Sequence, residues 1–132
     1  MNGTSTNDDT VDVIVPLSPR HASTLRTMAA TLGADTGFSI DEIDDFKLAI
    51  TEAFSMLVSG YSAQRARVSF TGLASAVDVR MSLETGDAIS IEPDELALAI
   101  MKAVVDSYQI GRNAISLRKV AVEAFTPGAG TS

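Results

Sequence analysis

The segment Ser39-Ile-Asp-Glu-Ile-Asp-Asp-Phe-Lys-Leu-Ala-Ile-Thr-Glu-Ala-Phe-Ser-Met-Leu-Val58 decides the fold, because it predicts a long amphipathic helix with a marked start. Ser39 and Glu42 have the spacing of a capping box, in which each side chain accepts a hydrogen bond from the other residue's backbone N–H. One apolar stripe recurs at helical spacing and is expected to be buried; its members are Phe46, Ile50, Ala53 and Leu57. Gly60 is expected to end the helix.

A strand and a second helix are predicted before this segment. Residues 11–15 alternate and then become wholly apolar, which is typical of a strand. Ser18 and Pro19 predict a helix start, with serine as N-cap and proline at the first helical position. This helix is expected to run to about Leu32, where Gly33 would stop it.

Hairpins dominate the rest of the chain. Strands are predicted at 67–71 and 76–83, and again at 108–110 and 114–122, with a helix from Leu96 to about Ser107 between the two pairs. The order β-α-α-β-β-α-β-β predicts an α+β two-layer sandwich, with a mostly antiparallel sheet and helices on one face. Residues 11–125 are expected to form one domain, flanked by disordered tails at 1–10 and 126–132.

Composition narrows the function classes. The formal net charge is −7 and there is no cysteine, so disulfides, thiol catalysis and cysteine-ligated metals are excluded. The acidic balance disfavours direct nucleic-acid binding and anionic membranes, and it favours a protein partner with a basic patch. The polar N-terminus does not resemble a signal peptide, and no apolar run is long enough to span a membrane. We therefore expect a cytoplasmic protein.

Four stretches resemble one family, the histidine kinase-like ATPases of the Bergerat (GHKL) fold, and within it the bacterial anti-sigma factors that are also serine-protein kinases. The resemblance covers roughly residues 11–123 and implies that fold. It is carried by Val13-Ile-Val-Pro-Leu-Ser-Pro-Arg20, Ile43-Asp-Asp-Phe-Lys-Leu-Ala-Ile-Thr-Glu-Ala53, Val77-Asp-Val-Arg-Met-Ser-Leu-Glu-Thr-Gly-Asp-Ala88 and Glu95-Leu-Ala-Leu-Ala-Ile-Met-Lys-Ala-Val-Val-Asp106.

The nucleotide-binding motifs of that family are altered in this chain. In the family, the helix reads Glu-Ala-x-x-Asn-x-x-x-His, where the acid activates a water and the Asn holds Mg²⁺. Here Glu52 is retained, but Met56 takes the Asn position and Ser59 the His position. A methionine offers Mg²⁺ no oxygen ligand. The altered pocket that the resemblance implies comprises Glu52, Met56, Glu84, Gly86 and Ala88.

The residues at the remaining motif positions also differ from those that bind the nucleotide in the family. Glu84 replaces the adenine-binding Asp, Ala88 the second glycine of that motif, and Glu95 and Ala97 the two phosphate-loop glycines. Only eight residues separate Gly86 from Glu95, so the phosphate-covering lid is expected to be lost. We therefore expect neither cofactor nor metal, and a former pocket filled by side chains.

The preferred interpretation is an anti-sigma factor-like regulator that sequesters a sigma factor without ATP or kinase activity. The resemblance implies a general-stress or sporulation sigma factor as partner, a possible STAS-domain anti-anti-sigma antagonist, and a homodimer. The alternative is an atypical ATP-binding serine-protein kinase acting on such an antagonist. A third interpretation is that the domain serves as a partner subunit of a catalytically active relative and contributes only a dimer interface.

Surface residues on the first helix are the candidates for partner contact. Arg20, His21, Thr24 and Arg26 are expected on its exposed side, where the resemblance implies contacts with the sigma factor. An ordinary solvated face is the competing interpretation, as it is for Glu52. Met56 is read as filling the core, and Arg112, Arg118 and Lys119 as solvated surface. The lone His21 has no companion at metal-ligand spacing.

Overall fold

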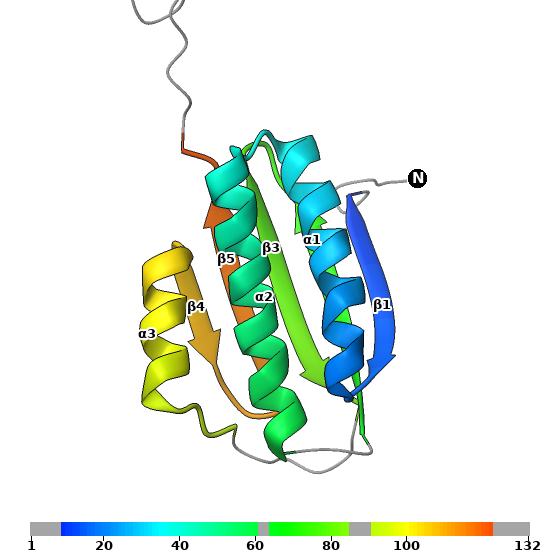
Figure 1. Ribbon diagram of the computed structural model, residues 1–132. Helices are drawn as coiled ribbons and strands as arrows, with labels where there is room; N and C mark the ends of the chain where they lie inside the picture. Colours follow the sequence, from blue (N-terminus) through cyan, green and yellow to red (C-terminus); the bar gives the residue numbers. More distant parts are fainter. Residues whose placement is uncertain (1–8, 61–63, 85–90, 123–132) are drawn as a thin grey trace, which may run out of the picture.

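The structure is a computed structural model that describes residues 9–60, 64–84 and 91–122. Within this part of the chain, five antiparallel strands form one sheet, and three α-helices cover one of its faces (Figure 1). This is the two-layer α+β sandwich that the sequence predicts. In chain order the elements are β1 (Thr10–Pro16), the 3₁₀ turn η2 (Pro19–His21), α1 (Ala22–Thr36), α2 (Ile40–Gly60), β2 (Arg65–Gly72), β3 (Ala76–Leu83), α3 (Glu95–Val104), β4 (Ser107–Ile110) and β5 (Ala114–Val120).

The strands lie in the order β1-β2-β3-β5-β4, so β3 is the central strand and β5 lies between β3 and β4. The register places Val68 beside Val13 and Met81, and Met81 beside Ile115. Because side chains alternate along a strand, this apolar row faces the helices while the intervening residues face the other side. The core therefore lies between the sheet and the helices.

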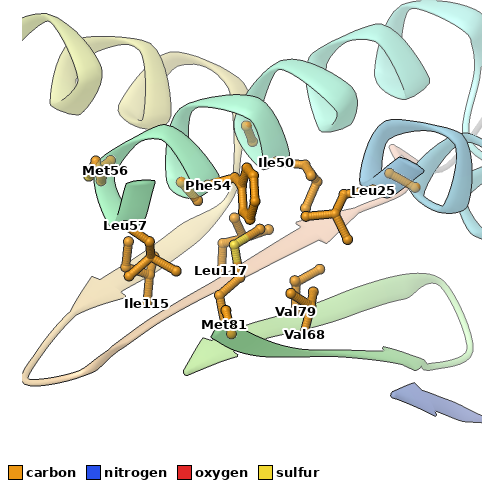
Figure 2. Packing of buried hydrophobic residues seen from close by; sticks show 14 of the residues in the cluster. Leu25, Ile50, Phe54, Met56, Leu57, Val68, Val79, Met81, Ile115 and Leu117 are labelled. Carbon is orange, nitrogen blue, oxygen red and sulfur yellow. The ribbon is translucent and has the colours of Figure 1, made fainter. Parts of the chain in front are cut away.

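Helix α2 follows its prediction closely. The Glu42 backbone N–H donates to Ser39 Oγ at 3.1 Å, and the Ser39 backbone N–H donates to Glu42 Oε1 at 2.7 Å. The predicted stripe is fully buried. Figure 2 shows Ile50, Phe54 and Leu57 directed from α2 toward the strands. The capping box and the apolar stripe are thus both confirmed.

Helix α1 differs from its prediction at both ends. Pro19 begins a short 3₁₀ turn, and the Ser18 side chain makes no capping hydrogen bond. The helix continues past Gly33 to Thr36 and ends at Gly37, whose φ of 96° is the left-handed conformation that favours glycine. Gly33 is buried inside the helix because the Phe38 ring folds back onto it.

Replacing Gly33 with alanine is expected to lower the free energy of unfolding by about 1–2 kcal/mol. A Cβ at this position would lie 2.7 Å from Phe38 Cδ2 and 3.4 Å from Ile43 Cγ1. This clash outweighs the helix propensity that alanine gains, about 0.5–1 kcal/mol. Urea denaturation followed by circular dichroism measures the effect.

Gly111 is the matched control for this substitution, because a Cβ there would meet nothing within 4 Å. Gly111→Ala is expected to change the free energy of unfolding by less than about 0.5 kcal/mol. Equal stability of Gly33→Ala and the wild type would show that the Phe38 ring moves aside without cost.

Further boundaries differ from the sequence predictions, among them those of β2, which spans Arg65–Gly72 rather than 67–71. Thr10, assigned to the tail, is the first residue of β1. Helix α3 ends at Val104, because Val105 is extended, with ψ of 162°, and Ser107 already belongs to β4. Strand β5 ends at Val120, although its prediction reached Val122. The predicted tails otherwise lie outside the described residues, apart from Asp9.

Candidate functional site

The segment that resembles a nucleotide-binding motif lies on α2, and its residues Glu52 and Met56 differ in their exposure to solvent. Met56 is 8% exposed and belongs to the hydrophobic core. Glu52, one turn earlier, is half-buried and makes no hydrogen bond or ion pair with another described residue. Figure 2 shows Met56 beside Leu57 toward the C-terminal end of α2. The position that the resemblance matches to a magnesium ligand is thus occupied by a buried thioether.

Helix α3 packs against α2 and contributes apolar side chains to the same core. Ala97 is 3% exposed, Met101 is fully buried, and Ile91 just before the helix is also buried. Neither of two surface hollows formed by described residues is lined by Glu52 or Met56. Among the described residues, buried apolar side chains therefore pack between α2 and α3.

The acids at the other motif positions already have structural roles or lie in solvent. Glu84 is exposed, and its Oε2 lies 3.5 Å from Arg67 Nε on β2. Asp94 is the N-cap of α3 and accepts a hydrogen bond of 2.6 Å from the Ala97 backbone N–H. Glu95 adds a second acid to the first turn. A phosphate at this helix start would meet two carboxylates and an N–H group that is already bonded.

Three residues of the former motif cannot be placed in this arrangement. Gly86 and Ala88 lie outside the described residues, as does the first half of the short segment between Gly86 and Glu95. Ser59 belongs to α2, but its side chain is not described. Within the described ranges, no group of three His, Asp or Glu side chains is placed to hold a metal ion.

The four residues proposed for partner contact do not form one exposed surface. Arg20 and Thr24 are exposed, whereas His21 and Arg26 are half-buried. Arg26 Nη1 donates to Thr51 Oγ1 on α2 at 3.2 Å, so its side chain spans the two helices. His21 Nε2 is buried and has no hydrogen-bond partner among the described residues. The expectation that all four lie on the exposed side is wrong for His21 and Arg26.

Lys119 is also placed differently from its prediction as solvated surface. Its side chain is 11% exposed, and Nζ donates to the Val104 carbonyl at 2.9 Å, 3.8 Å from Asp45 Oδ2. A cation at the C-terminus of α3 interacts favourably with the helix dipole. Lys119 thereby joins the end of α3, helix α2 and strand β5.

Glu42 forms a second junction at the N-terminal end of α2. Besides capping this helix, its Oε2 accepts a hydrogen bond from the Val122 backbone N–H, just past β5. Hydrogen bonds from the backbone N–H groups of Ser39 and Val122 lower the pKa of Glu42 below its ordinary value of 4.5. This carboxylate therefore serves the fold, as its prediction as a capping charge implies.

The helix-free face of the sheet carries a polar hollow that sequence reasoning missed. It has a volume of about 470 Å³ and is lined in part by Ser69, Arg80, Gln109 and Ser116. These residues occupy polar positions of separate predicted strands, and this polarity is the only indication of the hollow in the sequence. Their proximity follows from the strand register, which the sequence pattern alone does not give.

No model of a known protein family matches the sequence, and no curated protein matches it. None of the helices in the described ranges combines the length and apolar character needed to cross a membrane.

Proposed function

We propose that this chain is a regulatory binding protein of the anti-sigma factor type, which sequesters a sigma factor in the cytoplasm by surface contact and uses no ATP. The observation that carries the non-enzymatic half of this proposal is the burial of Met56 and Ala97 in the core between α2 and α3. A nucleotide at that position would have to displace packed apolar side chains. The class of partner comes from the sequence resemblance to anti-sigma factors of the histidine kinase-like ATPase family.

Two features of the molecule support a binding role. The element order is the one that the resemblance implies. The formal net charge of −7 favours a partner that presents a basic surface.

Without phosphoryl transfer, release of the sigma factor depends on competition, for which a STAS-domain antagonist is the proposed agent. A homodimer is part of the same proposal.

Titration calorimetry with ATP and Mg²⁺ tests the non-enzymatic half. We expect no measurable binding for the wild type. The variant Met56→Asn restores an oxygen ligand, and it is also expected not to bind, because Glu84, Glu95 and the apolar residues of α3 remain. Met56→Leu is the matched control for the packing role, with a change in stability below about 1.5 kcal/mol. A micromolar dissociation constant for ATP would instead favour the serine-protein kinase.

The partner half is tested with purified sigma factors from the source cell. Each is mixed with the chain and examined by size-exclusion chromatography with light scattering, which also reports the oligomeric state of the free chain. One sigma factor of the stress or sporulation class is expected to form a near-stoichiometric complex. If none does, the sigma-factor proposal fails, whatever the result with ATP.

A further inference from the structure

Arg80, on the helix-free face of the sheet, has no counter-ion among the residues that the structure describes. Arg80 lies on the central strand β3, is exposed, and makes no hydrogen bond or ion pair with another described residue. The register places Ser69 of β2 on one side of Arg80 and Ser116 of β5 on the other. Gln109 of β4 lies beside Ser116 and extends the row. Arg80 thus has neutral polar side chains beside it on the adjacent strands, and the paired Asp78 and Arg118 line the same hollow.

The neighbouring arginines on the same face are already paired. Arg118 makes a bidentate ion pair with Asp78, with Nε–Oδ1 and Nη2–Oδ2 distances of 2.6 and 2.9 Å. Arg67 lies 3.5 Å from Glu84 and 4.0 Å from Asp12. These carboxylates already have partners. Among the described residues that line the hollow, Arg80 is therefore the charged side chain that has no ion-pair partner.

The side chains around Arg80 offer hydrogen-bond donors. A guanidinium carries five N–H donors, each serine a hydroxyl, and Gln109 an amide NH₂. The side chains of Ser69, Ser116 and Gln109 make no hydrogen bond with another described residue. An oxygen acceptor with negative charge satisfies such a set, and a carboxylate matches the planar guanidinium bidentately.

We propose that this hollow is a docking site for an acidic peptide segment of a protein partner, with Arg80 binding one glutamate or aspartate carboxylate. The hollow lies on a sheet face and is open, so it suits a side chain presented by a protein surface. A polyanion such as nucleic acid is disfavoured by the overall charge of −7, whereas a single carboxylate meets mainly the local positive charge. The helix-free face that carries the hollow lies on the opposite side of the sheet from α1 and α2 (Figure 1). The experiment that tests acidic-peptide binding does not depend on the proposed function.

The test is a titration of the full chain with an N-acetylated, C-amidated peptide Gly-Ser-Glu-Ser-Gly, followed by ¹H–¹⁵N NMR. The amide signals of Ser69, Arg80 and Ser116 are expected to shift and saturate, with affinity that falls as salt is raised. Arg80→Gln is expected to weaken binding at least fivefold. Arg112→Gln removes the same charge from an exposed position in the β4–β5 turn, outside the hollow, and is expected to leave the affinity unchanged.

Two further titrations decide between possible occupants. The same peptide with glutamine in place of glutamate is expected to produce no saturating shift, and inorganic phosphate is expected to bind more weakly than the glutamate peptide. Equal shifts with the glutamine peptide, unchanged affinity in Arg80→Gln, or tighter binding of phosphate would each overturn the proposal. The dispersion of the Arg80→Gln spectrum verifies that this variant is folded.

Discussion

Replacing Phe46 with alanine is expected to lower the free energy of unfolding by about 3–5 kcal/mol, the largest effect of any substitution considered for this chain. Phe46 is fully buried on the core stripe of α2, and its ring packs edge-on against Phe38 with centroids 5.5 Å apart. The substitution leaves a cavity beneath α2 and removes this aromatic contact. Urea or guanidinium denaturation followed by fluorescence or circular dichroism measures the loss.

Leu48 is the matched control, because it is a large apolar residue of the same helix that is 40% exposed. Leu48→Ala is expected to cost less than about 1 kcal/mol. A double-mutant cycle with Phe38→Ala should give a coupling of about 0.5–1.5 kcal/mol for the ring pair. A Phe46→Ala protein as stable as Leu48→Ala would contradict the placement of α2 on the core.

Replacing Glu42 with glutamine is expected to lower the free energy of unfolding by about 2 kcal/mol at neutral pH, because hydrogen bonds to a charged acceptor contribute about 1.5–3 kcal/mol. The wild-type carboxylate accepts from the backbone N–H groups of Ser39 and Val122 with separate oxygens. Glutamine keeps one carbonyl oxygen and presents an NH₂ group to the other donor. Chemical denaturation at pH 7 measures the difference.

The effect of Glu42→Gln should also depend on pH. The pKa of Glu42 is lowered in the folded state from its ordinary value of 4.5, so its contribution to stability is complete above that value and is lost as pH falls through the folded pKa. The difference from the wild type should therefore be constant above about pH 5.5 and shrink below 4.5.

Asp41 provides the control for this pH dependence. It lies in the same first turn of α2, is exposed, and makes no hydrogen bond with another described residue. Asp41→Asn removes the charge near the helix dipole only, with an expected cost of about 0.3–1 kcal/mol. If Asp41→Asn and Glu42→Gln had the same effect at every pH, the two specific hydrogen bonds of Glu42 would contribute nothing.

Features encoded within a few residues were predictable from the sequence. The capping box of Ser39 and Glu42 and the buried stripe of α2 depend on spacings along one helix, and both are present. The alternating strand at 76–83 was located to the residue. The order of the predicted elements along the chain was enough to give the fold class, because helices and hairpin strands have few ways to cover each other.

Features that depend on partners distant in sequence were not predictable. Glu42 bonds Val122 across 80 positions. Lys119, expected in solvent as a charged residue, lies on the same face of β5 as Ile115 and Leu117 and reaches the end of α3. Gly33 looked like a helix stop because glycine has that role in isolated helices, and only the fold-back of Phe38 explains it inside α1. In each case the deciding contact is tertiary.

The candidate sites also combine features that are predictable from the sequence with features that depend on tertiary contacts. The sequence alone shows that Met56 offers no oxygen ligand to a metal ion. The packing of Ala97 and Met101 beside α2 could not be predicted, because it depends on where α3 lies in the fold. Arg80, Ser69 and Ser116 belong to three strands whose register brings them together. The half-burial of Arg26 follows from the contact of α1 with α2 through Thr51.

The insertion of β5 between β3 and β4 has a consequence for biosynthesis. When Leu83 leaves the ribosome, β1, β2, β3 and two helices have been made, but the central strand β3 is still an open edge. Such an edge can pair with other chains. At about 5–20 residues per second, the segment that ends at Val120 takes several more seconds to translate. Throughout that interval the nascent protein exposes the edge of β3 that β5 later pairs with. We therefore expect chaperone binding to protect the chain most at this stage.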